Sequence, residues 1–347
     1  MNRQFPPEII QLIVDASFPS EVITSTANGI YTLQIFARYS ILKRYSVLNS
    51  TWNGVCEAAL YSNVVLKSDL LVSTFVQSAG RNGGAVGKMV STMTIACDGW
   101  RNRRAVAVLK CVPQLRRLTI GYASFHAQDL ADMHRLDELT LILCTFAIPP
   151  PSTQLSIHSL FLYSYGPSKA ISALLSTTIL PKLKQLDVEV WAPAPIDFSW
   201  ILPQLSALQI RVGYSRADIR HLSDDQSLRL LSYESTQLGI HPPSLTTLPP
   251  FMMVYIRNHH ELMQSLSHFF TKSAGLKTLF ARCKHVEVVG SDKETETELL
   301  VTKLRSKGIV VEIRTGTFSF SDAIRRMDAI LLAEKAAAEE YSRVYGE

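Results

Sequence analysis

The hexapeptide Leu-Arg-Arg-Leu-Thr-Ile at residues 115–120 is followed, at residues 136–141, by Leu-Asp-Glu-Leu-Thr-Leu. Both have the form leucine, two residues, leucine, one residue, apolar residue. Because the last two apolar residues are two positions apart, a short strand points both to the same side. The first leucine then packs beneath the turn that precedes the strand. The pattern therefore predicts one strand per copy, each with one apolar face.

The same pattern recurs along the middle of the chain. Further copies begin at Ile157, Leu183, Leu205 and Leu228. Successive copies start 21, 21, 26, 22 and 23 residues apart, within the period of roughly 20–29 residues that is typical of leucine-rich repeats. Such units stack into a parallel sheet because none can bury its apolar face alone. An earlier copy is expected at 90–95, an irregular one within 245–254, and a later one at 276–281. An ordinary α/β domain with leucine-rich strands is the alternative.

The segments outside these copies complete the expected α/β architecture. Helical or irregular connections are predicted at Arg101–Val112, Ala127–Met133, Pro167–Ser176 and Leu262–Ser273. Strands are then expected at His285–Val289 and Gly308–Arg314. A final helix is predicted over Asp322–Arg343, capped by Ser321 and carrying apolar residues at helical spacing.

The N-terminal stretch is a different kind of sequence. Residues 5–14 read Phe-Pro-Pro-Glu-Ile-Ile-Gln-Leu-Ile-Val. The two prolines suit the first turn of a helix, where backbone N–H groups have no partner, and Glu8 is favoured there by the helix dipole. The apolar residues cover more than one face, so this helix is either sunk in its own domain or partly covered by another chain. A second helix is predicted from about Ile41 to Cys56, ending in the aromatic anchor Trp52.

This stretch resembles the F-box. The resemblance rests on Pro-Pro-Glu-Ile-Ile at residues 6–10 and Val-Leu-Asn-Ser-Thr-Trp at 47–52. Leu-Tyr-Ser-Asn-Val-Val-Leu at 60–66 looks like the strand that follows F-boxes of fungal proteins. The pattern departs from the usual one at Phe5, at 49–51, and in the longer connection 18–39. The repeats behind it are similar to the leucine-rich repeats that often follow F-boxes, with Cys144 and Cys283 as candidates for the Asn or Cys after the strand.

The resemblance implies an F-box-like helical module at residues 1–66, an irregular leucine-rich-repeat solenoid at 67–315, and a C-terminal closing helix at 316–347. It implies a substrate receptor of a cullin–RING, SCF-type ubiquitin ligase, which docks on a Skp-type adaptor and binds a protein target. The residues expected to contact the adaptor, or to hold the shape of that contact, are Pro6, Pro7, Ile9, Ile10, Ile13, Leu48 and Trp52. Catalysis would reside in other subunits.

Six aromatic residues lie at the ends of the predicted strands, where a protein target could reach them. They are Tyr122, Phe125, Tyr163, Tyr165, Trp191 and Tyr214. Aromatic anchors often dominate the affinity of a protein interface. Two other hypotheses stay open: an interaction scaffold without a ligase role, whose N-terminal helices only cap the repeats, and an enzyme built on this fold.

Composition narrows the function classes. The chain has 347 residues, of which 47% are hydrophobic and 19% charged, with a net charge of +5; this describes a folded protein. Basic residues are scattered, so nucleic-acid binding is not expected. None of the five cysteines lies at Cys-x-x-Cys spacing, which argues against a disulfide scaffold or structural zinc. With no signal peptide or transmembrane run recognised, a cytoplasmic or nuclear location is expected.

Motifs for catalysis or cofactor binding are weak. The glycine-rich stretch 80–89 lacks the first glycine and the Ser or Thr of a phosphate-binding loop, so it is predicted to be a loop. The adjacent His259 and His260 do not have metal-ligand spacing. We therefore expect no metal, no cofactor and no enzymatic activity.

Overall fold

A computed structural model describes most of the chain. The described residues are 5–17, 40–80, 84–96, 104–150, 152–164, 168–190, 196–198, 201–212, 217–218, 227–235, 250–256, 283–290, 301–302, 304–306, 308–314 and 320–345. The chain divides into an N-terminal unit, Met1–Thr119, and a C-terminal unit, Ile120–Glu347. The division falls within strand β3 (Arg117–Gly121).

The N-terminal unit begins with three helical segments. They are α1 (Pro7–Ser17), residues 40–46, and α3 (Ser50–Ser62). The prediction of one helix from Ile41 to Cys56 is wrong, because the chain turns at 47–49. Asn49 caps α3: its side-chain oxygen accepts a hydrogen bond from the backbone N–H of Trp52 at 3.0 Å. An asparagine at this position satisfies a donor that a helix start otherwise leaves unpaired.

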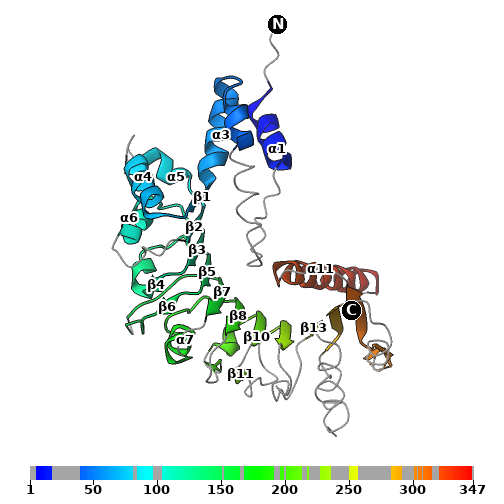
Figure 1. Ribbon diagram of the computed structural model, residues 1–347. Helices are drawn as coiled ribbons and strands as arrows, with labels where there is room; N and C mark the ends of the chain where they lie inside the picture. Colours follow the sequence, from blue (N-terminus) through cyan, green and yellow to red (C-terminus); the bar gives the residue numbers. More distant parts are fainter. Residues whose placement is uncertain are drawn as a thin grey trace. The chain divides into compact units, whose positions relative to one another are not determined.

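Helices α1 and α3 share a small core. Ile10 and Val14 of α1 are buried against Leu42, Cys56 and Ala59. Figure 1 shows α1 beside α3. Tyr45 and Trp52 border this core, with ring centroids 5.4 Å apart.

The rest of the N-terminal unit joins strands to helices. Strand β1 (Asn63–Leu66) pairs in parallel with β2 (Thr92–Ala96). Helices α4 (Asp69–Gly80), α5 (Ala85–Met89) and α6 (Arg104–Cys111) connect them or follow them. The stretch 80–89 was predicted as a loop, but its second half is the short helix α5, which starts after Gly84 in the left-handed conformation.

Among the described residues, the C-terminal unit contains eight strands that pair in parallel, in chain order. They are β5 (Glu138–Ile142), β7 (Ser159–Ser164), β8 (Gln185–Val190), β10 (Ala207–Val212), β12 (Leu230–Ser235), β13 (Phe251–Ile256), β14 (His285–Gly290) and β15 (Val310–Arg314). The strand order does not return from β15 to β5, so these strands form no closed barrel.

Short elements occupy the connections. They include β4 (Ser124–Phe125) paired with β6 (Thr145–Phe146), β9 (Ile196–Asp197) paired with β11 (Ala217–Asp218), the 3₁₀ turns η3 (Ala127–Leu130) and η4 (Leu202–Gln204), and α7 (Ser168–Leu174). The helices predicted near 101–112, 127–133 and 167–176 thus occur, in shortened form, as α6, η3 and α7. The one predicted at 262–273 lies outside the described residues.

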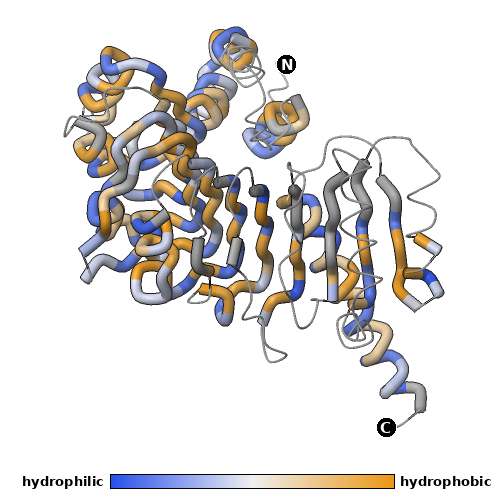
Figure 2. Tube along the Cα trace, turned by 60° about the horizontal axis from the view of Figure 1, so that its bottom comes forward, coloured by the Kyte–Doolittle hydropathy of each residue, from blue (hydrophilic) through white to orange (hydrophobic). Residues whose placement is uncertain are grey.

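The strand register places the repeated apolar residues in line. Leu139 pairs with Leu160, Leu160 with Leu186, Leu186 with Leu208, and Leu208 with Leu231. All five are buried, and Figure 2 shows apolar segments following one another from strand to strand. The strands predicted from the leucine spacing are confirmed at these positions, as is the predicted strand over His285–Val289. The copy expected at 276–281 lies outside the described residues.

The last helix, α11 (Phe320–Tyr345), packs on the other face of this sheet. Its first turns contribute Phe320, Ala323, Ile324 and Met327 to a core with Ala207, Leu230 and Phe251. These three residues pair with one another across β10, β12 and β13, and Figure 1 shows α11 beside these strands. The sequence predicted the helix; its contact with the sheet face is new. From Leu332 to Arg343 the helix is exposed.

Substituting Gly87 should destabilise the N-terminal unit. A Cβ atom at this buried glycine would lie 1.8 Å from the carbonyl oxygen of Cys111, so Gly87→Ala forces α5 and α6 apart and should cost about 1–3 kcal/mol. The matched control is Gly54→Ala in α3, where a Cβ meets nothing within 4 Å and should stabilise the helix by up to about 1 kcal/mol. Urea denaturation measures both; equal effects would contradict the packing described.

Candidate functional site

Helix α1 is apolar on two sides. Ile10 and Val14 face the core, whereas Ile9 is 41% and Leu12 63% exposed. Residues three or four apart share a helix face, so Ile9 and Leu12 form a stripe separate from the buried pair. Leu48, in the turn before α3, is 59% exposed. Ordinary surface helices carry one apolar stripe, so the second stripe is the feature of this unit that most needs explaining.

The residues predicted to contact an adaptor fall into three groups. Pro6, Pro7, Ile9 and Leu48 are exposed. Ile13 and Trp52 are partly buried, and Ile10 is fully buried. Ile10 can therefore hold the shape of the surface but offers no area for contact. Phe5, Leu12 and Val47, which were not among the residues predicted to contact an adaptor, are also exposed.

Only some of the aromatic residues predicted to bind a target lie within the described part of the chain. Tyr122, which follows β3, is 57% exposed and has a positive φ of 56°. Its backbone N–H donates to the carbonyl oxygen of Ile142 at 2.9 Å. Tyr163 lies within β7 and is half-buried, and Phe125 lies in β4. Tyr165, Trp191 and Tyr214 lie outside the described residues.

On the sheet face opposite the leucines, charged side chains form a network between β8 and β10. Arg211 donates to Asp187 at 2.7 Å and to Glu189 at 3.0 Å. Gln209 donates to the other carboxylate oxygen of Asp187 at 3.1 Å. The guanidinium also lies over the ring of Phe161, 5.5 Å from its centroid. The network arises because these residues alternate with the apolar ones and meet through the strand register.

Burial raises the pKa of one carboxyl group in this network. Removal from water raises the pKa of Asp187 from 3.8 to about 6, against the opposing effects of Arg211 and Gln209. Loss of hydration penalises a carboxylate, and a nearby cation offsets only part of the penalty. A buried carboxyl with a raised pKa is a recognised sign of a functional site, but structural ion pairs produce the same shift.

The free cysteines behave as structural residues. Cys144 and Cys283 are buried, and burial raises their pKa values to about 11 and 12. The Cys144 thiol donates to the carbonyl oxygen of Ile120 at 3.4 Å, so it links two neighbouring strand ends. Cys283 lies two residues before the start of β14. Thiols with raised pKa values are poor nucleophiles at neutral pH.

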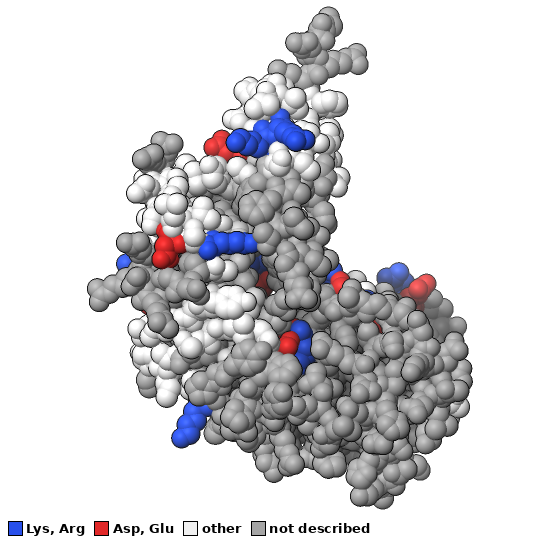
Figure 3. Space-filling view, viewed as in Figure 1, with Lys and Arg blue, Asp and Glu red and all other residues white. Residues whose placement is uncertain are grey.

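Figure 3 shows no large patch of one charge among the described residues on the face that it presents. The Lys and Arg side chains of the described residues lie singly or in small groups there, some beside acidic ones. Among the described residues, no helix has the length and apolar character needed to span a bilayer.

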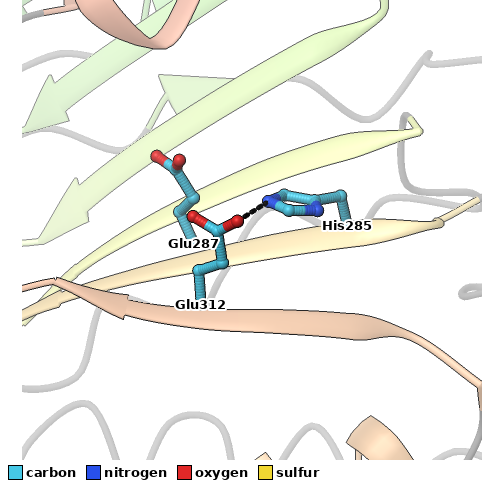
Figure 4. A group of neighbouring side chains, drawn as sticks. All are labelled: His285, Glu287 and Glu312. Carbon is cyan, nitrogen blue, oxygen red and sulfur yellow. Dashed lines mark ion pairs between the residues drawn. The ribbon is translucent and has the colours of Figure 1, made fainter. Parts of the chain in front are cut away.

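A second polar cluster lies in the last two strands, β14 and β15. His285 and Glu287 of β14 and Glu312 of β15 offer ligand-type atoms that all lie within 4.8 Å of one another (Figure 4). Arg326 of α11 donates to both carboxylate oxygens of Glu287, each at 2.8 Å. Among the described residues, three buried side-chain atoms of this sheet face lack a hydrogen-bond partner: Gln209 Oε1, Ser232 Oγ and His285 Nε2.

Sequence reasoning missed both polar clusters. A signal was present, because each charged residue stands between two apolar residues of a strand. Writing the repeat copies one below another would have aligned Asp187 with Gln209 and Glu189 with Arg211. No protein-family model matches the chain, and no curated protein shows significant similarity to it.

Removing Arg326 should destabilise the C-terminal unit. Arg326→Met leaves the buried carboxylate of Glu287 without its two-pronged partner, which should cost about 3 kcal/mol or more. The neighbouring Arg325 pairs with Asp322 on the exposed side of α11, so Arg325→Met should cost less than about 1 kcal/mol. Urea denaturation compares the two variants. Similar losses of stability would show that the ion pair between α11 and β14 does not account for the effect of Arg326→Met.

Asp187 should make stability depend on pH. Its raised pKa means that the folded chain binds this proton more tightly than the unfolded chain, so stability falls as pH rises from about 4 to 6 and is constant above. When the pH is lowered from 6 to 4, the free energy of unfolding of the unmutated chain should increase, relative to that of Asp187→Asn, by at most about 3 kcal/mol. Denaturation across this range checks it. Glu189→Gln should reduce this pH dependence only slightly, because the charge of Glu189 is the smallest of the effects on the pKa of Asp187. A constant difference from Asp187→Asn would refute the assignment.

Proposed function

We propose that this chain is a substrate-receptor subunit of a cullin–RING, SCF-type ubiquitin ligase. Residues of its N-terminal helices dock on a Skp-type adaptor, and the irregular leucine-rich-repeat solenoid behind them binds a protein target. The observation that carries the proposal is the second apolar stripe of α1, with Leu48 also exposed. Ile9 and Leu48 belong to the Pro-Pro-Glu-Ile-Ile and Val-Leu-Asn-Ser-Thr-Trp segments on which the F-box resemblance rests, and Leu12 lies two residues after the first of them.

The burial pattern supports a docking role for this surface. The unit already has its own core, formed by Ile10, Val14, Leu42, Cys56 and Ala59. Ile9, Leu12 and Leu48 add nothing to that core and leave apolar area in water. Contiguous exposed apolar residues commonly mark protein–protein contacts, and a few central side chains supply most of the affinity there.

The sheet supports the repeat part of the proposal. Its strands follow one another in chain order, all parallel, with the repeated leucines in register. This arrangement is what stacked repeats produce. The core of α11 covers β10, β12 and β13, so we place target binding toward β5 and β7, where Tyr163 and the nearby Tyr122 lie.

The alternative is an interaction scaffold without a ligase role. The pairing of β1 with β2 favours it, because a helical segment joined in this way to the first strands also serves as a cap. Adaptor binding separates the two functions, since a cap has no need of the exposed stripe.

Adaptor binding should depend on the exposed residues. Ile9→Asp combined with Leu48→Asp should weaken binding of the purified full chain to a Skp-type adaptor by about 2 kcal/mol or more, roughly thirty-fold. Stability should change by less than about 1 kcal/mol because both side chains are exposed. Isothermal titration calorimetry measures the affinity, and circular dichroism checks the fold.

Leu332→Asp is the matched control, since Leu332 is an exposed leucine of α11, and this change should leave adaptor affinity unchanged. Ile10→Asp is unsuitable because Ile10 lies in the core. If the unmutated chain does not bind the adaptor, the ligase proposal fails and the scaffold function stands.

A further inference from the structure

The cluster of His285, Glu287 and Glu312 has the arrangement of a cation site. His285 and Glu287 are two positions apart on β14, so both side chains leave the same face of the sheet. Glu312 is the direct neighbour of Glu287 on β15. The strand pleat and the register together therefore bring three ligand-type atoms within 4.8 Å of one another (Figure 4).

A second observation points to a ligand at this cluster. His285 is only 8% exposed, and its Nε2 atom is buried without a hydrogen-bond partner. Glu312 Oε1 lies 3.9 Å from this nitrogen, which is within ion-pair distance but beyond hydrogen-bond distance. A buried imidazole nitrogen without a hydrogen-bond partner is unfavourable. A metal ion between Nε2 and the carboxylates would accept its lone pair.

We propose that His285, Glu287 and Glu312 bind a divalent transition-metal ion of the zinc class. One imidazole nitrogen and two carboxylate oxygens suit such ions, whereas Mg²⁺ and Ca²⁺ prefer oxygen ligands throughout. Zinc lies about 2.0–2.2 Å from such ligands, so the three atoms must close by about an ångström on binding. Rotation of the partly exposed Glu312 side chain can supply most of that movement.

Arg326 is compatible with this site. It occupies one lone-pair position on each carboxylate oxygen of Glu287. A carboxylate offers about four such positions, so the two hydrogen bonds from Arg326 do not exhaust them. An outer partner of this kind fixes the orientation of a ligand carboxylate. The ion would then join β14 to β15 beneath the helix that Arg326 anchors, which makes its role structural.

Zinc titration of the full chain tests the site. After dialysis against a chelator, zinc sulfate is added and followed by calorimetry, with magnesium chloride as the comparison salt. The unmutated chain should bind about one zinc ion at this site and melt at a higher temperature with zinc than with magnesium. Glu312→Gln and His285→Gln should each weaken binding at least about tenfold, since even outer partners cost that much.

Glu334→Gln is the matched control, because Glu334 is an exposed carboxylate that pairs with Lys284 and should leave zinc affinity unchanged. Cobalt absorption distinguishes nitrogen and oxygen ligands from thiolates. If His285→Gln fails to fold, the partly exposed Glu312→Gln decides. The proposal is overturned by absent zinc binding, by equal binding in Glu312→Gln, or by thiolate bands, which would assign the ion to cysteines.

Discussion

The structure depends on the burial of one apolar row per strand. Leu139, Leu160, Leu186 and Leu208 stand side by side in the register, and none could leave water without its neighbours. Removing apolar surface from water is the main favourable term in folding. The intervals between copies vary from 21 to 26 residues, yet the pairing does not shift. Length differences are therefore absorbed in the connections, where no row of side chains has to be matched.

The strand pleat also determines which residues lie on the opposite face of the sheet, and this face carries polar as well as apolar residues. Every residue between two buried leucines points to this face. At the entries of β10, β12 and β13 it is apolar, with Ala207, Leu230 and Phe251 covered by α11. One step further along, it carries Asp187, Gln209, Ser232 and Glu287, all buried. Buried polar groups need partners, which explains the Arg211 network and the Arg326 ion pair.

The sequence predicted the features that depend on local spacing. Leucines two positions apart indicated the strands from β5 to β12, and the apolar spacing after Ser321 indicated α11. It did not indicate where α11 packs, because that contact joins residues more than a hundred positions apart, such as Ala207 and Phe320. The Asp187–Arg211 pair needs the strand register as well as the spacing. The missed break between the two helices before and after Asn49 is a local error. The apolar spacing indicated one continuous helix, whereas Asn49 caps the start of a new one, α3.

The two proposed binding sites, at α1 and at β14, differ in how far their residues also stabilise the fold. In α1, Ile10 and Val14 maintain the fold while Ile9 and Leu12 remain exposed, so a surface change there need not disturb the core. At β14, the same carboxylate of Glu287 is buried, paired with Arg326 and close to His285. Any ligand of that cluster must therefore be coupled to the packing of α11, because both act on one side chain. Under the two proposals, binding at the N-terminal helices can therefore change independently of stability, whereas binding at the last strands cannot.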